Sequence, residues 1–191
     1  MITLIIGTSG SGKSLLAEEL CMQTGDHERV YLATMQVLDE AGRERIKKHR
    51  KQRAGKGFVT LERDTAIDQA LADINDAGHA TVLLESVTNL AGNEMHAGYG
   101  AEKIAEDVER LAAGVHNLII VTDDYADDVE FDDETRAYVR LLKTVNGRLA
   151  GMADRVIDLL KADRSDVSGM IGRDGPAGIS GDTYGSGESA I

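Results

Sequence analysis

The loop Gly7–Ser14, with the sequence GTSGSGKS, is the feature that most constrains the fold of this chain. It follows the apolar run Ile2–Ile6 and opens into the segment Leu15–Leu20, which has helical character. This is the phosphate-binding pattern G-x-x-x-x-G-K-[ST] between a strand and a helix. A plain glycine- and serine-rich turn is the alternative, but the pattern and both flanks agree. The segment therefore predicts a site for a nucleoside triphosphate.

The residue types of this loop explain why it binds phosphate. Glycines allow successive backbone N–H groups to point inward at phosphate oxygens, and the start of the following helix adds its positive dipole end. Lys13 can reach the terminal phosphates as a catalytic cation, and the Ser14 hydroxyl can ligate Mg²⁺. The loop residues expected to bind the nucleotide are Gly7, Thr8, Ser9, Gly10, Ser11, Gly12, Lys13 and Ser14.

Apolar runs alternate with helical patterns along the chain, which is typical of an α/β protein with a mostly parallel sheet flanked by helices. The runs are rich in Ile, Leu and Val, as expected of strands covered on both faces. The predicted strands are Ile2–Ile6, Val30–Ala33, Phe58–Leu61, Thr81–Glu85, Asn117–Thr122 and Arg155–Leu159. The predicted helices are Lys13–Thr24, Asp39–Gln52, Thr65–Asp76, Ala101–Ala113 and Asp132–Met152.

The chain divides by composition near residue 160. With 191 residues, a single domain is expected, and residues 1–160 contain every predicted strand and helix. Residues 161–191 lack apolar runs and are rich in Gly, which predicts a flexible tail. A loop that becomes ordered over a ligand or a neighbouring subunit is the alternative for this segment.

Charge is distributed unevenly in this acidic chain. The net charge of −12 argues against a nucleic-acid-binding protein. Residues 43–56, however, contain eight of the 21 Lys and Arg residues and one of the 33 acidic residues. A basic island in an acidic chain indicates a local anion site.

His49 lies within this basic island. If Asp39–Gln52 is helical, Arg45, His49 and Arg53 project from one face at i, i+4 and i+8. An imidazole between two guanidinium groups is a competent nucleophile toward phosphorus, because the flanking cations lower its pKa and hold the phosphate oxygens. A solvated basic helix with an incidental histidine is the alternative.

Carboxylates end two of the predicted buried strands, at the edge where α/β proteins bind ligands. Glu85 closes the run Thr81–Glu85, where it could hold Mg²⁺ or hydrogen-bond a base or ribose. A structural carboxylate that caps the next helix is the alternative. Asp123 follows the strand Asn117–Thr122 and is a second candidate ligand for the metal, with Asp124 as the alternative.

The remaining candidate residues predict no further site. Cys21 is the only cysteine, so an intramolecular disulfide is excluded, and a packed thiol in a reducing, cytoplasmic compartment is expected. No run has transmembrane length, and the N-terminus is not that of a signal peptide. The other histidines show no metal-ligand spacing and are expected to be structural or exposed: His27, His79, His96 and His116.

Four stretches together resemble the bifunctional adenosylcobinamide kinase / adenosylcobinamide-phosphate guanylyltransferase family of cobalamin biosynthesis. The second is the most specific, since it combines A-T-x-x-x-D with R-I-x-x-H. The four stretches are Gly7–Ser14, Val30–Asp39 followed by Arg45–His49, Leu83–Leu90, and Val121–Thr122 leading to Val145–Ala150 and Ala153–Val156.

This resemblance implies a fold, an activity and a set of site residues. Family members have RecA-like P-loop sheets and assemble as trimers. They phosphorylate adenosylcobinamide with ATP or GTP, and then transfer GMP from GTP to the phosphate through a guanylylated histidine, which His49 matches. Lys13, Ser14 and Glu85 then serve the nucleotide and Mg²⁺. The nucleotide-binding residues expected outside the loop are Thr34, Arg45, Arg53 and Glu85.

The chain departs from the family pattern after its fifth predicted strand. The family's Asn-Glu-Val-Gly and Gly-Ile-Val-Pro stretches are replaced by Asp123–Ala126 and Asp128–Phe131, without the glycines and the proline. Two alternatives remain open at this point. One is a small-molecule kinase without nucleotidyl transfer, in which His49 only binds anions. The other is a noncatalytic, nucleotide-binding regulatory relative.

Overall fold

The computed structural model describes residues 1–25, 28–37, 39–125 and 131–160. His27 and the predicted glycine-rich tail, 161–191, lie outside the described residues. The expectation for the tail therefore stays a prediction.

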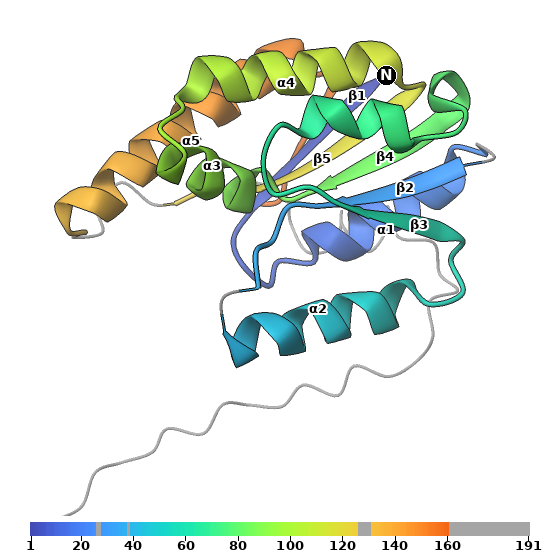
Figure 1. Ribbon diagram of the computed structural model, residues 1–191, viewed down its shortest axis with the longest axis horizontal. Helices are drawn as coiled ribbons and strands as arrows, with labels where there is room; N and C mark the ends of the chain where they lie inside the picture. The colour runs from blue at the N-terminus through green and yellow to red at the C-terminus, as the bar shows by residue number, and fades with distance from the viewer. Residues whose placement is uncertain (26–27, 38, 126–130, 161–191) are drawn as a thin grey trace, which may run out of the picture.

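Six strands form one sheet in the order β3-β2-β4-β5-β1-β6, and every neighbouring pair is parallel (Figure 1). The predicted strands are confirmed to within two residues at each end. Because all strands run the same way, their carboxyl ends meet at one edge, where the loops that carry function lie. The strands are β1 (Ile2–Gly7), β2 (Glu28–Ala33), β3 (Phe58–Glu62), β4 (Ala80–Glu85), β5 (Asn117–Asp123) and β6 (Arg155–Asp158).

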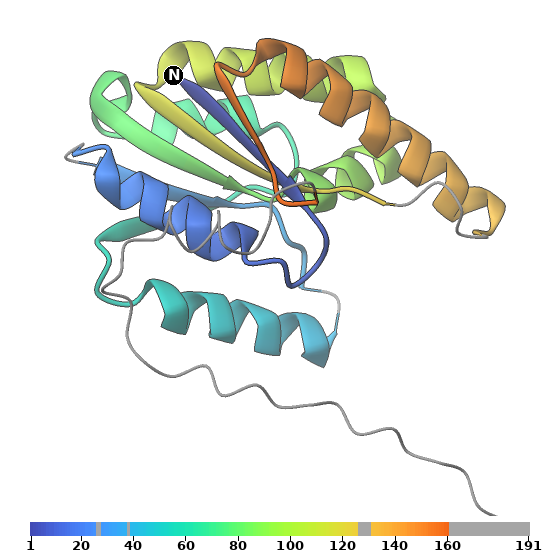
Figure 2. The ribbon, with the colours of Figure 1, turned by 180° about the vertical axis from the view of Figure 1, so that it is seen from behind.

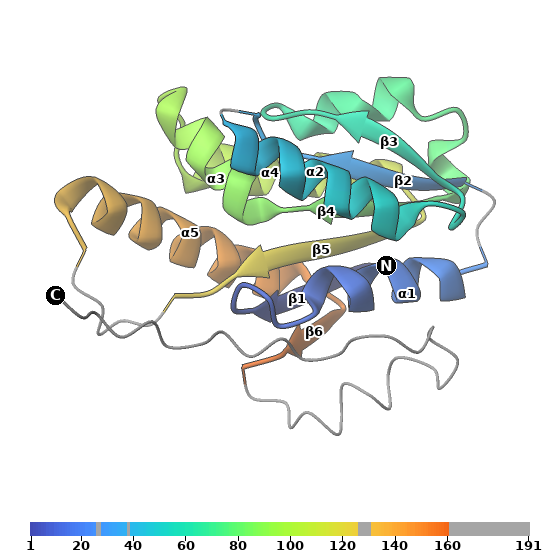
Figure 3. The ribbon, with the colours of Figure 1, turned by 90° about the horizontal axis from the view of Figure 1, so that it is seen from below.

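Helices cover both faces of the sheet, because successive strand residues point to opposite sides. In β1, Leu4 packs into the core beneath α3 (Val87–His96), α4 (Ala101–Gly114) and α5 (Asp133–Met152). Its neighbour Ile5 packs against α1 (Lys13–Gln23) on the other face. Seen from below, α1 lies in front of β1, whereas α2 (Glu40–Arg53) lies in front of β2 (Figure 3).

Two helix predictions differ from the structure. The helix predicted over Thr65–Asp76 is not an α-helix. The segment forms a 3₁₀ helix over Ile67–Asp73 instead. Its buried residues Ile67 and Ala70 are three apart, which matches the three-residue turn of a 3₁₀ helix. Helix α3 was not predicted at all. Ser86 caps α3, since its hydroxyl accepts a hydrogen bond from the Asn89 backbone N–H.

The predicted inward face of the last helix is confirmed. Leu142, Val145 and Leu149 of α5 are fully buried in the core, and Tyr138 and Leu141 pack against it. The Cys21 thiol is buried as expected, and burial raises its pKa to about 12. In the part of the chain that the structure describes, no helix combines the length and apolarity that a membrane span requires.

Candidate active site

The phosphate loop connects β1 to α1 at the carboxyl edge of the sheet. A Cβ at Gly7 would lie 2.6 Å from the Ser11 hydroxyl oxygen and 3.2 Å from Leu159 Cβ, so a larger residue there would force the loop or its side chains to shift. Gly12 precedes the first turn of α1 with φ of 90°, in the left-handed region that favours glycine. The backbone is therefore shaped for close approach of an anion to the N-terminus of α1.

Lys13 connects the loop to the end of β5. Its ammonium donates to the Thr8 carbonyl oxygen at 2.6 Å and forms an ion pair with Asp123 at 2.7 Å. The Lys13 side chain is only 8 % exposed, so this charge is held in a fixed place at the rim of the loop. The structure thus brings together two of the predicted site residues, Lys13 and Asp123.

Ser14 and Glu85 meet beside the same loop. The Ser14 hydroxyl donates to Glu85 Oε1 at 2.8 Å, while Glu85 Oε2 is buried with no hydrogen-bond partner among the described residues. Burial is the main cause that raises the pKa of Glu85, to about 7. The alternative of a helix-capping Glu85 is not what the structure shows, because Ser86 caps α3.

These oxygens fit Mg²⁺ bound together with a nucleotide. Within residues 1–25, 28–37, 39–125 and 131–160, no three His, Cys, Asp or Glu side chains group as a metal site. Mg²⁺ does not need such a group of side chains, since it commonly binds one or two protein oxygens and completes its coordination with phosphate oxygens and water. The unpartnered Oε2 of Glu85 and the adjacent Ser14 hydroxyl supply that number.

Helix α2 places His49 opposite the loop. Asp39 starts the helix by accepting a hydrogen bond from the Gly42 N–H at 2.7 Å. Of the helix residues, Gly42, Ile46, His49 and Arg53 lie on the more buried face, and Arg45 is exposed. The prediction that Arg45, His49 and Arg53 share one face of the helix is therefore only partly confirmed. The buried face shifts over these two turns, so Arg53 is buried while Arg45 stays exposed.

One cleft of about 410 Å³ joins the phosphate loop to α2. It opens between the loop, the carboxyl ends of β4 and β5, and the basic face of α2. An anion bound at the phosphate loop and the His49 imidazole can therefore share one cavity. The predicted site residues that line this cleft are Ser9, Gly10, Ser11, Gly12, Lys13, Ser14, Arg45, His49, Glu85 and Asp123.

The environment of His49 favours its neutral form. Burial lowers the pKa of the half-buried imidazole, and the nearby Arg53, Lys48 and Arg45 lower it further, against the opposing charge of Glu18. Its Nδ1 is buried and has no partner in the described chain. A neutral imidazole with a free lone pair has the form that a nucleophile needs.

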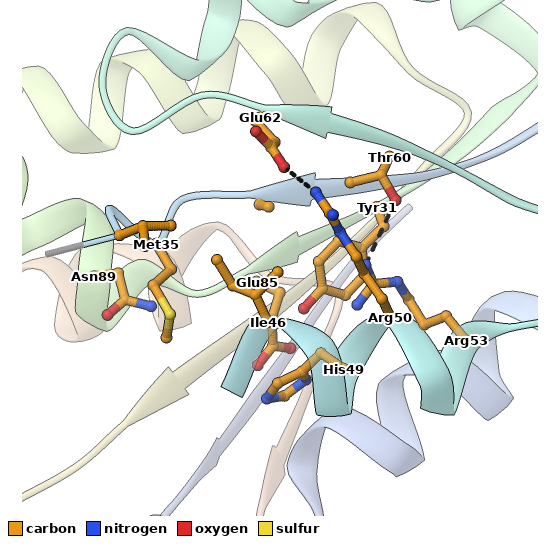
Figure 4. Close-up of a pocket in the computed structure, with 12 residues that line it drawn as sticks. Tyr31, Met35, Ile46, His49, Arg50, Arg53, Thr60, Glu62, Glu85 and Asn89 are labelled. Atoms are coloured by element: carbon orange, nitrogen blue, oxygen red, sulfur yellow. Dashed lines mark hydrogen bonds and ion pairs between the residues drawn. The ribbon is translucent and has the colours of Figure 1, made fainter. Parts of the chain in front are cut away.

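A second, smaller cavity of about 80 Å³ lies between α2 and the ends of β2 and β3. His49 and Glu85 line both cavities, and Figure 4 shows them with Arg53 and Tyr31. The Arg53 guanidinium lies 3.3 Å from the centre of the Tyr31 ring, and its Nη1 has no partner among the described residues. Arg53 therefore faces this second cavity and does not line the phosphate cleft.

Thr34 is not brought to the cleft. Its side chain is fully buried, and its hydroxyl donates to the Ser86 carbonyl oxygen at 2.7 Å and accepts from the Ser86 N–H at 2.9 Å. Two hydrogen bonds to the backbone occupy this hydroxyl. The structure therefore corrects the expectation for Thr34, which fixes the backbone next to Glu85 instead of lining the nucleotide cavity.

Sequence reasoning missed three residues that shape the site. Glu18 is fully buried on α1 and accepts from Gln52 at 3.0 Å and from Lys56 at 2.6 Å, which ties α1 to the end of α2. Met35 and Asn89 line both cavities. Glu18 could have been singled out from the sequence, because it is an acidic residue among the apolar positions of α1. Asn89 could not, because it lies on α3, the helix that was not predicted.

The sequence comparisons point to one family. The family described as "Cobinamide kinase / cobinamide phosphate guanyltransferase" matches residues 3–161. The bifunctional adenosylcobalamin biosynthesis protein CobU of Escherichia coli (strain K12) is 40% identical over 105 residues, 54% of this chain. Those residues are also 54% of that protein, so the match spans about half of its length.

One solved structure supports the fold. A prototypical ATPase from the type III secretion system of pathogenic bacteria superposes with a TM-score of 0.52 at 12% identity, covering 88% of this chain and 52% of that one. The flagellar accessory protein FlaH from Methanocaldococcus jannaschii gives a TM-score of 0.46 at 14% identity, covering 82% and 70%. The predicted fold class, a parallel sheet flanked by helices with a P-loop between β1 and α1, is confirmed.

Proposed function

The chain belongs to the cobinamide kinase / cobinamide phosphate guanyltransferase family, and we propose that it carries out both reactions of that description. In the first, it phosphorylates the hydroxyl of adenosylcobinamide with ATP or GTP. In the second, it transfers GMP from GTP to the new phosphate, giving adenosylcobinamide-GDP and pyrophosphate.

The observation that carries this proposal is the shared cleft. A half-buried imidazole of lowered pKa, His49, lines the same cavity as the phosphate loop. A kinase alone has no need for a neutral histidine opposite the phosphates. A nucleotidyltransferase that works through a covalent intermediate needs an unprotonated nucleophile, and a neutral histidine can supply one.

This geometry supports the following transfer step. An unprotonated nitrogen of His49 attacks the α-phosphorus of GTP, the nitrogen–phosphorus bond forms, and the bond to pyrophosphate breaks. The phosphate oxygen of the acceptor then attacks the same phosphorus, and the bond to His49 breaks. Lys13 and Arg45 line the cleft and offset the charge that develops on the phosphate oxygens.

Mg²⁺ fits the oxygens beside the loop. Ser14 and Glu85 would hold the ion, with Asp123 close by as a further carboxylate. When bound, the ion neutralises phosphate charge and orients the phosphates. Resemblance to the family further supports a trimer that works in the cytoplasm on a corrinoid substrate.

The test is the intact mass of the protein after incubation with GTP and Mg²⁺. We expect a gain of one guanylyl group that is labile to acid, and its loss in His49→Ala. His79→Ala is the matched control, because His79 is exposed and pairs with Asp76 away from the cleft. If the wild-type protein binds GTP without gaining mass, the guanylyltransferase proposal fails and a kinase-only or regulatory protein is favoured.

A further inference from the structure

A third cavity adjoins the phosphate cleft on the side away from α2. It is a groove of about 380 Å³ between α3 and the N-terminal half of α5. It shares Met35, Thr88 and Asn89 with the phosphate cleft, and Met35 and Asn89 also line the cavity under α2. Asn89 therefore stands at the meeting point of three cavities.

The chemistry of the groove differs from that of the cleft. Its lining is mostly amide, hydroxyl and thioether, with Glu134 and His96 as its titratable side chains besides Tyr138, and it includes neither Lys nor Arg. A triphosphate finds no lysine or arginine there. A neutral molecule that carries amide groups finds both donors and acceptors. The polar and thioether residues are Gln36, Thr88, Asn89, Asn93, Thr135, Tyr138, Met35 and Met95.

The walls of the groove are fixed to the phosphate site by hydrogen bonds. The Tyr138 hydroxyl donates to the Thr88 carbonyl oxygen at 2.9 Å. The Thr88 hydroxyl accepts from the backbone N–H of Asp123 at 2.8 Å, and the Asp123 carboxylate pairs with Lys13. A molecule in the groove is thus positioned by the same framework that positions Lys13.

We propose that this groove is the acceptor subsite, which binds the amide-bearing edge of the corrinoid and directs its hydroxyl arm past Asn89 into the phosphate cleft. This inference rests on the proposed function. A corrin ring is far larger than the groove, so only an edge with its side chains enters. Because the oxygen that accepts the phosphoryl group carries the phosphate that later accepts GMP, one groove serves both reactions.

Gly92 offers a way to block the groove without touching the cleft. It lies in α3 and lines the groove, and a Cβ there would lie 3.7 Å from Tyr138 Cε2, an ordinary contact. Gly92→Ala is therefore compatible with the fold, whereas the longer side chain of Gly92→Leu would project into the groove. The matched control is Gly151→Leu, an exposed position on α5 with open space around it.

Equilibrium binding of adenosylcobinamide, followed by the absorbance of the corrinoid, is the measurement. We expect Gly92→Leu to raise the Kd by at least about tenfold, with a matching rise in the KM of both reactions. Gly92→Ala should have a smaller effect and Gly151→Leu none. Guanylylation of His49 by GTP alone should be unchanged in all three variants, since the donor cleft is intact.

The outcomes separate this inference from the proposed function. An unchanged Kd in folded Gly92→Leu overturns the groove assignment, and so does a wild-type protein that does not bind the corrinoid. If the wild-type protein binds the corrinoid, Gly92→Leu weakens that binding, and no product forms, the groove assignment stands and the proposed function falls. Loss of His49 guanylylation in Gly92→Leu would show that the groove also serves GTP, and would overturn its assignment to the corrinoid acceptor alone.

Discussion

The two walls of the phosphate cleft are held in different ways. The phosphate loop continues from β1 into α1, where Ile5, Leu16 and Ala17 are fully buried against one another. Helix α2, which carries His49, is joined to the rest of the chain largely through polar side chains, and it stands off from the sheet in the view from behind (Figure 2). The comparison teaches that the wall formed by the phosphate loop is held by the core, whereas the wall that carries His49 is held by a few side-chain contacts.

The contacts of α2 can be named individually. Gln52 and the following Lys56 bond to the buried Glu18, Arg50 pairs with Glu62 at 2.8 Å, and Arg53 lies over the Tyr31 ring. Only the contacts to Glu18 and Tyr31 are substantially buried. Each can be removed singly, and the two walls should respond differently.

The largest effect is expected from Lys13→Ala on the core-held wall. Loss of this buried cation should lower both phosphoryl and guanylyl transfer by roughly a thousandfold, because the charge acts on the transferring phosphates. Steady-state rates with circular dichroism as the folding check give the measurement. Lys47→Ala, an exposed lysine paired with Glu44 on α2, is the control, and retained kinase turnover in Lys13→Ala would contradict the role.

Ile5→Ala should lower the free energy of unfolding by removing part of the core beneath the phosphate loop. Ile5 is fully buried between β1 and α1, so its truncation leaves a cavity and should cost about 2–5 kcal/mol of unfolding free energy. Denaturant unfolding measures this cost. A loss below about 1 kcal/mol would mean that the loop does not depend on the core beneath it.

Glu18→Gln tests the other wall. The amide cannot accept from both Gln52 and Lys56 as the carboxylate does, so the end of α2 should lose its fixed position. Guanylylation of His49 should slow by about ten- to a hundredfold, because misplacing a nucleophile is costly, while GTP binding stays unchanged. Glu19→Gln, on the same helix, is the control. Equal losses in binding and guanylylation would show that the two walls are not held separately.

The pH dependence of guanylylation reports on the surroundings of His49. Burial and then the charges of Arg53, Lys48 and Arg45 lower its pKa, and Glu18 opposes them. Because the pKa is lowered, the inflection of the single-turnover rate should lie below pH 6.5, with the rate declining as pH falls through it. Arg53→Met should move the inflection upward. An inflection above 6.5 in the wild-type protein would rule out this electrostatic environment.

Arg50→Ala should have the smallest effect. Arg50 and Glu62 are 61 % and 66 % exposed, and exposed ion pairs contribute less than about 1 kcal/mol. Guanylylation and denaturant unfolding should both stay near the wild-type values. A large loss of guanylylation here would show that α2 depends on its surface pairs as well as on Glu18.

Much of the fold could be predicted from local patterns. Continuous apolar runs such as Leu118–Val121 predict strands, because strands buried on both faces need apolar residues at every position. Helix α3 escaped prediction because Gly92 and Asn93 weaken its helical propensity, so tertiary burial of Val87, Leu90 and Ala91 decides its structure. The segment around Ile67 was assigned to the right place and to the wrong kind of helix.

The site could be predicted only in part, for physical reasons. Lys13, Ser14 and Glu85 follow from a loop pattern and a strand end, which fix position directly. Arg53 and Thr34 were expected at the nucleotide because a sequence shows which residues neighbour a motif, but not which way a helix turns or which hydroxyl the backbone occupies. Long-range contacts such as Glu18 to Lys56 leave no local pattern.

The basic face of α2 also has a kinetic consequence. The chain as a whole repels anions, since its net charge is −12, while residues 43–56 place a concentrated positive field beside one side of the cleft. For the proposed triphosphate substrates, this charge pattern should favour approach along the basic side of the cleft and so raise productive encounters. The association rate of GTP should accordingly fall steeply as ionic strength shortens the reach of that field.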